Sequence, residues 1–284
     1  MKKKFFLALS VAVVASGAIF FACSKEEKAN EDKGNSKSAV VDSKQQINNL
    51  SKEVAEIHDY VIQAYLADLY KSTDIFDEKY MNTVNPFIKA SIQNYPFKYA
   101  KIEDFNDYTL QFFTYQDIRN ILSNGYNYSK YIKFESKADL SVIEKKCSII
   151  EKKFQELFYV SSTLQEFETE YYAFVEKEIG SINNLDTYAS IRFFADMYMS
   201  SFKTWCTYIY SGNEKSSGWW DKVKKTAASV WNEIRPVVVA DAAGAAVGAL
   251  AGCAPALATA GLSVPGAALA GACLGSIDAG IGQL

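Results

Sequence analysis

Apolar side chains recur every three or four positions through the middle of the chain, which is the spacing of one buried helix face. The clearest series cover residues 47–69, 143–178 with one longer step, and 188–202, and weaker helical signals cover 86–94 and 103–123. Between residues 47 and 211, glycine occurs only at Gly125 and Gly180, which argues against a turn-rich β fold. The pattern predicts an all-α fold, with an antiparallel helical bundle as the body over residues 47–212 and an irregular stretch at 82–101.

The pattern changes after Arg235, where small apolar residues replace the mixture of apolar and charged positions. Residues 236–284 hold nine of the fifteen glycines, sixteen alanines and no Lys or Arg. Small residues recur four apart, so each of two predicted helices carries a smooth stripe along one face. The stripes consist of Gly244, Gly248 and Gly252 in the first helix, and of Ala267, Gly271, Gly275 and Ala279 in the second. The sequence therefore predicts a C-terminal Ala/Gly-rich helical hairpin, with helices at 237–260 and 264–281.

This hairpin has the length of a membrane-spanning element, since its helices would measure about 36 and 27 Å and a hydrocarbon core is about 30 Å thick. Small stripes let helix backbones approach closely in lipid, so we assign the five glycines of the two stripes to helix packing and self-association. The only charges, Asp241 and Asp278, fall at the open base, where they could line a polar opening. Insertion is near balance, because the strongly apolar residues of the first helix contribute roughly −3 kcal/mol and a central aspartate costs up to about +3 kcal/mol. The alternative is a hairpin packed in the core of the protein's own soluble domain.

Residues 261–263 supply the turn of the hairpin, with Ser263 as the cap of the second helix and Pro265 in its first turn. Cys253 and Cys273 are each ten residues from Ser263, which places them at the same height in a symmetric hairpin. The spacing allows a disulfide between them in an oxidising compartment but does not require one.

Residues 213–235 lead into the hairpin as a predicted amphipathic helix. Apolar positions recur at helical spacing from Trp220 to Ile234, and the lysines of this segment lie off that face. Tryptophan with lysine beside an apolar segment is typical of an interfacial helix, so we assign Trp219, Trp220 and Trp231 to a membrane interface. The alternative is an amphipathic helix on the surface of the body.

The N-terminus has the pattern of a targeting segment. Three lysines at positions 2–4 precede an uncharged apolar run from Phe5 to Phe21, and Ala22-Cys23 follows. A run of 17 residues broken by serine and glycine fits a signal-peptide core better than a stable span, although an uncleaved anchor helix is the alternative. The sequence around Cys23 resembles a bacterial lipoprotein box, with phenylalanine at position 20 in place of the usual leucine. The resemblance implies that residues 1–22 are removed and that Cys23 is lipidated.

The residues that follow Cys23 are Ser24, Lys25, Glu26 and Glu27, and they resemble the export signal of Bacteroidota surface lipoproteins. The resemblance implies an outer-membrane lipoprotein exposed at the cell surface, and the alternative is the start of a solvated linker. Residues 23–46 lack aromatic side chains and are rich in charged and small polar residues, so we expect a flexible tether there.

The composition and the motifs of the chain limit the classes of activity that it can have. The formal net charge of −3 argues against a nucleic-acid binder, which would carry a basic surplus. His58 is the only histidine and has no Glu-x-x-His partner, so we expect it to be solvated or satisfied in the core rather than catalytic. No phosphate loop, nucleophile elbow or zinc motif is present, so we expect no enzyme activity, no metal and no cofactor.

The hairpin suggests what the protein does. Its Ala/Gly rows resemble the glycine-zipper segments of bacteriocin-like peptides and other membrane-inserting effectors, which implies insertion into lipid, self-association and pore formation. The alternative is a non-enzymatic helical binding or structural lipoprotein of the outer membrane, whose body binds a protein partner and whose tail is an anchor or a packed element.

Overall fold

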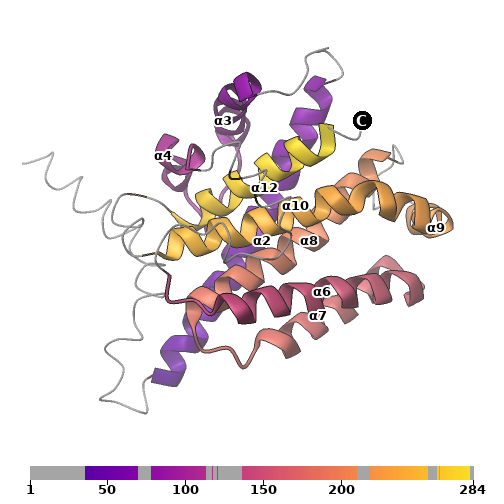
Figure 1. The fold of residues 1–284 in the computed structure, drawn as a ribbon, viewed down its shortest axis with the longest axis horizontal. Helices are drawn as coiled ribbons and strands as arrows, with labels where there is room; N and C mark the ends of the chain where they lie inside the picture. Colours follow the sequence, from indigo (N-terminus) through magenta and orange to yellow (C-terminus); the bar gives the residue numbers. More distant parts are fainter. Residues whose placement is uncertain are drawn as a thin grey trace, which may run out of the picture.

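The computed structural model describes residues 36–69, 78–112, 117, 120, 136–209, 218–254, 261 and 263–281. Every regular element in these ranges is a helix, which confirms the all-α prediction (Figure 1). The predicted signal peptide, Cys23 and the export residues Lys25, Glu26 and Glu27 lie outside the described residues.

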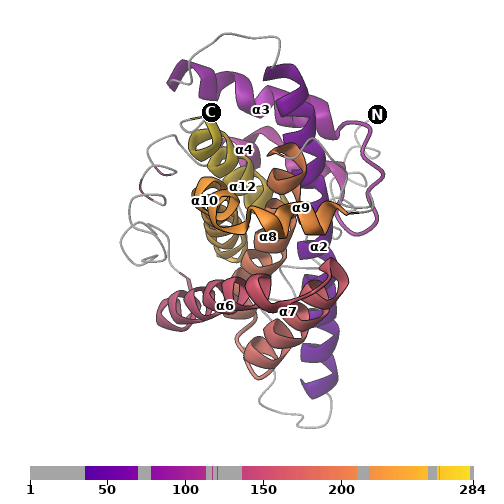
Figure 2. The same ribbon diagram turned by 90° about the vertical axis from the view of Figure 1, so that its right-hand side faces the viewer.

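The longest element, α2 (Ser36–Leu69), runs along the height of the molecule beside α8 in Figure 2. The predicted apolar series from Ile47 onward is its buried face. The helix begins at Ser36, so the prediction of a flexible tether is wrong for residues 36–46. Tertiary contacts order this segment, because Lys44 donates through Nζ to the Gly180 carbonyl at 2.9 Å and lies 5.0 Å from the centre of the Tyr188 ring.

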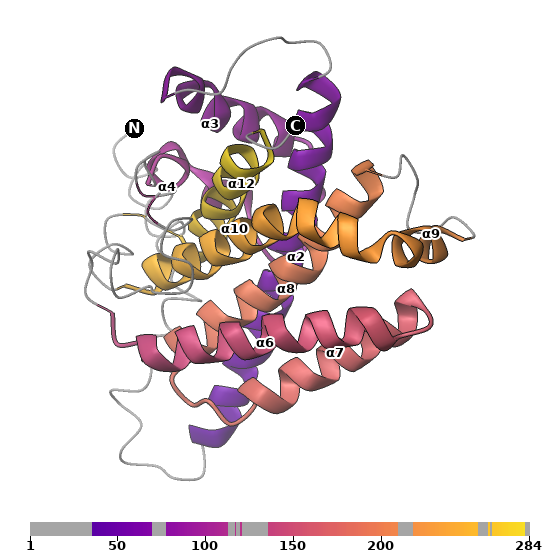
Figure 3. The same ribbon diagram turned by 45° about the vertical axis from the view of Figure 1, so that its right-hand side comes forward.

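Two antiparallel helices, α6 (Leu140–Val160) and α7 (Leu164–Ile179), lie side by side at one end of the molecule (Figure 3). The sequence suggested one long apolar series here, and the Thr163 cap at the start of α7 explains the break, whereas Asp139 caps the start of α6. Asp139 accepts a hydrogen bond from the Val142 N–H, and Thr163 accepts one from the Glu166 N–H. Each cap satisfies a backbone donor at a helix start, so the chain ends one helix and begins another.

The central element is α8 (Leu185–Ile209), which packs against α2, α6, α7 and α10. It is buried on nearly every face, so its predicted apolar stripe from Tyr188 to Phe202 describes only part of its buried surface. A helix enclosed on all sides divides the molecule into layers, with α6 and α7 on one side and the C-terminal helices on the other (Figure 1).

Short elements follow α2: α3 (Glu78–Ile92), the 3-10 helix η2 (Ile102–Phe105) and α4 (Asp107–Leu110). The irregular stretch is thus shorter than the predicted 82–101, because α3 continues through Pro86 to Ile92. The buried carboxylate of Glu53 holds the remaining loop, where it accepts hydrogen bonds from the backbone N–H groups of three successive residues. These are Lys98, Tyr99 and Ala100.

The C-terminal part contains α9 (Trp219–Lys225), α10 (Ala227–Cys253) and α12 (Val264–Ile281). The predicted boundary at residue 235 is not an element boundary, because α10 continues through Pro236. The first hairpin helix ends at Cys253 instead of 260. Ser263 caps α12 as expected, since its Oγ accepts from the Gly266 N–H at 3.2 Å. We call α10 and α12 the C-terminal hairpin.

Candidate functional site

The two helices of the C-terminal hairpin contact each other through their glycines. A Cβ atom added at any of these positions would meet the backbone of the facing helix well inside van der Waals contact. The distances would be 2.2 Å from Gly244 to Gly271 O, 2.1 Å from Gly248 to Ala267 O, 2.4 Å from Gly252 to Val264 Cα, 2.2 Å from Gly271 to Gly244 O and 2.7 Å from Gly275 to Ala240 O. All five glycines assigned to helix packing therefore lie in one contact within one chain.

The other faces of the hairpin are covered by the body. Residues 240–254 of α10 and 264–276 of α12 are all buried. Within the described residues, one helix, Trp231–Cys253, is long and apolar enough to cross a membrane, and 89% of its most apolar window is buried inside the protein. The hairpin in this state is thus a packed core element, which was the alternative interpretation. Its small stripes face each other and are not exposed to a second copy.

Body and hairpin are also joined by specific polar contacts. The Ser190 hydroxyl donates to the Ala246 carbonyl at 2.9 Å, and the Ser263 hydroxyl donates to the Asp104 carbonyl at 2.6 Å. Gly266 lies so close to Asp104 that an added Cβ would be 2.1 Å from its carbonyl oxygen. The small residues of the hairpin therefore serve the contact with the body as well as the contact between its own helices.

The three tryptophans assigned to a membrane interface are buried in this structure, with 1% of Trp219, 8% of Trp220 and 5% of Trp231 exposed. The interface assignment is therefore wrong for this state. Both Trp220 and Trp231 belong to an aromatic cluster between the hairpin and the layer of α6 and α7, where rings stack 5.3 to 5.6 Å apart. The cluster comprises Phe154, Phe158, Phe167, Phe202, Trp220 and Trp231. Edge and stacked ring pairs contribute about 0.5–1.5 kcal/mol each beyond the apolar area that they bury.

The burial of α9 leaves two polar atoms without compensation. The indole N–H groups of Trp219 and Trp220 have no hydrogen-bond acceptor among the described residues. An unsatisfied buried donor costs about 1–3 kcal/mol. The Lys224 ammonium, by contrast, donates to the Phe158 and Tyr159 carbonyls, each at 2.6 Å, and so ties α9 to the end of α6.

Four polar side chains meet where α2, α8, α10 and α12 converge, and we call them the polar centre: His58, Ser201, Asp241 and Ser276. The Nε2 atom of His58 lies 3.1 Å from Ser276 Oγ and 3.5 Å from Asp241 Oδ2. The Ser201 hydroxyl donates to the same Asp241 oxygen at 2.6 Å. All four residues are buried, and at most 1% of any of them is exposed.

Burial raises the pKa of Asp241 to about 6, and the effect is opposed by His58 and by the polar side chains of Ser201, Ser276 and Trp205. A fully buried carboxylate loses hydration, which disfavours its charged form, whereas nearby cations and donors favour it. Asp241 can therefore gain or lose a proton inside the protein near neutral pH.

The polar centre extends to Asp59, whose Oδ1 lies 3.4 Å from His58 Nδ1 and whose Oδ2 accepts from the Ser200 hydroxyl at 2.5 Å. Ser276, His58 and Asp59 thus have the connectivity of a hydrolytic triad. Ser276 is 1% exposed, so its hydroxyl presents no accessible nucleophile in this state. The chemistry that the arrangement supports is proton uptake and release between the hairpin and the body.

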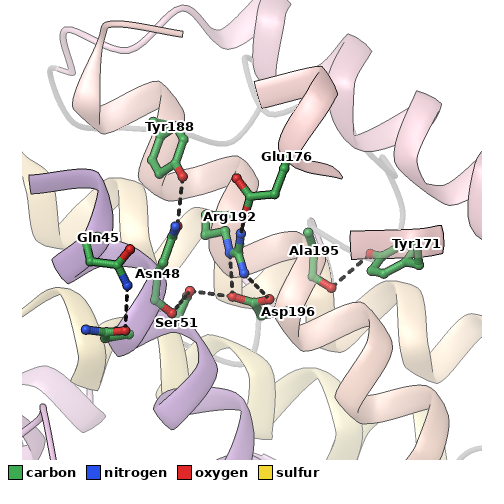
Figure 4. Close-up of polar contacts among 10 residues, drawn as sticks. Gln45, Asn48, Ser51, Tyr171, Glu176, Tyr188, Arg192, Ala195 and Asp196 are labelled. Atoms are coloured by element: carbon green, nitrogen blue, oxygen red, sulfur yellow. Dashed lines mark hydrogen bonds and ion pairs between the residues drawn. The ribbon is translucent and has the colours of Figure 1, made fainter. Parts of the chain in front are cut away.

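A second cluster, built on the buried side chains of Ser51, Arg192 and Asp196, ties the body helices to one another (Figure 4). Arg192 binds Asp196 through Nε at 2.8 Å and Nη2 at 3.1 Å, and Nη1 binds the Glu176 carboxylate. Ser51 of α2 donates to Asp196 Oδ2 at 2.5 Å. Although desolvation opposes it, the two carboxylates raise the pKa of Arg192 above its usual value, so this group stays charged. We call Ser51, Glu176, Arg192 and Asp196 the arginine cluster.

The structure corrects the expected geometry of the cysteines. Cys253 and Cys273 are both buried, and neither forms a disulfide. Since Gly244 faces Gly271, Cys273 lies beside Ala242, whereas Cys253 is next to Gly252 near the turn. The offset is about 11 residues, or roughly 16 Å along the helix, which is too far for a disulfide. The symmetric hairpin assumed from sequence is displaced because the turn is not centred on Ser263.

No protein-family model, curated protein or solved structure matches this chain. Within the described part of the chain, no group of three or more His, Cys, Asp or Glu side chains could hold a metal ion. Sequence reasoning placed His58 and Asp241 in different contexts and missed Ser201 and Ser276. The one charge in α10 after Arg235 was the available signal, because a buried carboxylate needs polar neighbours.

Proposed function

We propose that this chain is a lipoprotein of the outer membrane that stores a membrane-inserting hairpin inside its own helical body. One observation carries the proposal: apart from Asp241 and Ser276, the hairpin is apolar over residues 240–253 and 264–276, has its own glycine-to-glycine contact, and is enclosed by separate helices. A helix that is apolar all round belongs either to a protein core or to a membrane span. Because the contact between α10 and α12 needs no other element, the pair can move into lipid as a unit.

The surroundings of α9 support a state that can open. Trp219 and Trp220 bury indole N–H groups that find no acceptor among the described residues. At a bilayer interface the same rings would keep apolar contact and their N–H groups would meet water or lipid headgroups. Transfer of α9 to an interface therefore relieves a cost of the packed state, and the buried positions of these tryptophans are compatible with an interfacial role after release.

The predicted lipid on Cys23 would hold the protein at a bilayer, which raises the local concentration of the hairpin there. In this proposal the protein is attached by its N-terminus and acts by its C-terminus, with pore formation by associated hairpins as the antibacterial step. Replacement of Cys23 by alanine is expected to move the protein from the membrane fraction to the soluble fraction of the envelope and to abolish labelling by radioactive palmitate. Unchanged labelling would contradict the lipoprotein assignment.

The decisive experiment joins the hairpin to the body. The Ser190 hydroxyl of α8 donates to the Ala246 carbonyl of α10, so the two helices lie adjacent there, and cysteines at both positions are introduced to link the hairpin to α8. The full-length protein carrying Ser190→Cys and Ala246→Cys is added to vesicles of phosphatidylethanolamine and phosphatidylglycerol that contain a self-quenched dye. We expect dye release from the reduced protein and none from the oxidised protein, with formation of the link checked by the loss of free thiols.

The reduced and oxidised forms are the same chain, so each controls for the folding of the other. The single variant Ser190→Cys controls for reductant, because the four described native cysteines are buried and form no disulfide. Equal dye release from the oxidised and reduced forms would show that the hairpin need not leave the body, and it would refute the proposal.

The second candidate is a binding or structural lipoprotein in which the hairpin is a permanent core. The contacts of Ser190 with Ala246 and of Ser263 with Asp104 favour it, because they fix the hairpin to the body at defined positions. It predicts that α10 and α12 keep the slowest hydrogen exchange of the protein when vesicles are present. Selective loss of protection in α8 and α9, with continued protection in α10 and α12, would instead indicate insertion.

A further inference from the structure

We propose that the polar centre is an acid-sensitive latch, in which the charge on Asp241 retains the hairpin in the body and its neutralisation permits insertion into lipid. This inference rests on the proposed function and names its trigger. The latch lies at a meeting point of both hairpin helices with the two central body helices, and it joins Asp241 and Ser276 of the hairpin to His58 and Ser201 of the body.

The charge on Asp241 is less costly when the hairpin is inside the body than when it is inside a bilayer. Inside the body, the carboxylate faces His58 at 3.5 Å and the Ser201 hydroxyl at 2.6 Å, so its negative charge is partly compensated. Inside a bilayer, α10 has no other charged residue from Pro236 to its end at Cys253, and α12 offers no cation to pair with. A charged aspartate thus favours the body over lipid, whereas a protonated aspartate removes most of that preference.

The groups facing Asp241 from each element are few. From α2 it faces His58, which is in turn beside Asp59. From α8 it faces Ser201 and Trp205, and from α12 it faces Ser276 and lies close enough to Cys273 to affect that thiol. Burial raises the pKa of the Cys273 thiol well above its usual value, so this thiol stays neutral and the charge of the centre is set by Asp241, His58 and Asp59.

The direction of the pH effect follows from linkage. A membrane-inserted Asp241 binds its proton more tightly than a compensated Asp241 in the body, so insertion takes up a proton and acid promotes it. Since burial in the body already raises the pKa of Asp241 to about 6, insertion is expected to rise as the pH falls and to level off below that value.

The test measures dye release and vesicle flotation for the full-length protein between about pH 8 and about pH 4.5, a range that includes the expected plateau. The wild-type protein is expected to insert on the order of a hundredfold better on the acid plateau, which is the penalty of one central aspartate expressed as an equilibrium ratio. Asp241→Asn cannot ionise at this position, so the part of the pH dependence that Asp241 causes should be lost. His58→Gln removes a group that favours the charged aspartate, so its plateau should begin at a higher pH.

Asp196→Asn is the matched control, because it neutralises a buried acid of the body outside the polar centre. Insertion of Asp241→Asn that follows the wild-type pH profile would overturn the latch while leaving insertion itself intact. Loss of pH dependence in Asp196→Asn would also overturn it, since loosening of the body would then be the cause. Failure of all these proteins to bind vesicles at any pH, with their helical content retained, would overturn the proposed function and the latch together.

Discussion

The arginine cluster and the polar centre are both buried groups of charged and polar side chains, and they differ in what they connect. The arginine cluster joins α2, α7 and α8, which all belong to the body, and it contains a guanidinium that cannot lose its charge near neutral pH. The polar centre joins the body to the hairpin through the buried carboxylate of Asp241, whose pKa burial raises to about 6. A permanent charge pair thus holds the body helices to one another, whereas the contact between body and hairpin, which the proposed function requires to open, depends on a titratable carboxylate.

The largest effect is expected from breaking the arginine cluster. Asp196→Leu leaves the Arg192 guanidinium buried with only the half-exposed Glu176 carboxylate as a charged partner. Removing one partner of a buried pair costs about 3–5 kcal/mol, so the urea midpoint of the variant should fall sharply. The loss should be nearly constant between about pH 6 and about pH 8, because the Arg192 guanidinium stays charged throughout that range.

The double variant Arg192→Met with Asp196→Leu provides the control for that measurement. Replacing both charges by apolar side chains of similar size removes the uncompensated charge, so much of the lost stability should return. A double variant as unstable as Asp196→Leu would mean that packing, and not charge, explains the loss.

Replacing the aspartate of the polar centre by a neutral residue should raise the stability of the protein, in contrast to the same kind of change in the arginine cluster. The pKa of Asp241 is raised in the folded protein, so the folded state binds the proton more tightly and ionisation of Asp241 destabilises it as the pH rises. This cost is absent below the unfolded pKa of about 4 and complete above about 6. Asp241→Asn should therefore be more stable than the wild type by about 2–3 kcal/mol at about pH 7.5.

The difference in stability between Asp241→Asn and the wild type should shrink toward zero as the pH falls to about 4, which urea unfolding across the pH range measures directly. Comparing the two proteins at each pH cancels the contributions of the other carboxylates. A constant difference would show that Asp241 does not change its protonation in this window. It would also remove the contrast between the two clusters.

The hairpin contact is expected to be the next most sensitive feature. A side chain at Gly248 would meet the Ala267 backbone at 2.1 Å, so stability should fall in the order Gly, Ala, Leu, by roughly 1–3 kcal/mol for Ala and more for Leu. Gly218 is the matched control, because its φ is 78° and no atom lies within 4 Å of an added Cβ. Substitution there should cost about 1–2 kcal/mol of backbone strain whatever the side-chain size. Size dependence at both positions would contradict the packing explanation.

The same comparison shows what the sequence could and could not predict. The stripes of small residues could be predicted because residues four apart share a helix face. The structure places Gly244, Gly248 and Gly271 in one contact between the two helices. The surface that each stripe packs against could not be predicted, because a stripe that fits a second copy of the chain in lipid also fits the neighbouring helix of the same chain in a protein core. Periodicity identifies a face, and only the tertiary arrangement determines what covers it.

The polar residues were harder to predict for a related reason. His58 and Ser276 are 218 positions apart in the sequence, and nothing local to either residue indicates the other. The Thr163 cap was present in the sequence, yet the apolar series from 143 to 178 continued past it with only one longer step. Local signals of helix starts give way to a strong hydrophobic pattern when the break is only three residues long.

The smallest effect on stability is expected from replacing the two tryptophans of α9. These variants distinguish the contribution of the buried rings from that of the indole N–H groups. Trp219→Phe and Trp220→Phe keep a buried ring and remove an N–H that has no acceptor among the described residues, so the folded protein should be unchanged or stabilised by up to about 1 kcal/mol. The same changes should weaken binding to vesicles, because an interface anchors the indole through that N–H. Trp231→Phe is the control, because Trp231 stacks against Phe154 and its loss should destabilise the aromatic cluster. A loss of stability in Trp219→Phe and Trp220→Phe, without weaker vesicle binding, would mean that these residues serve the core alone.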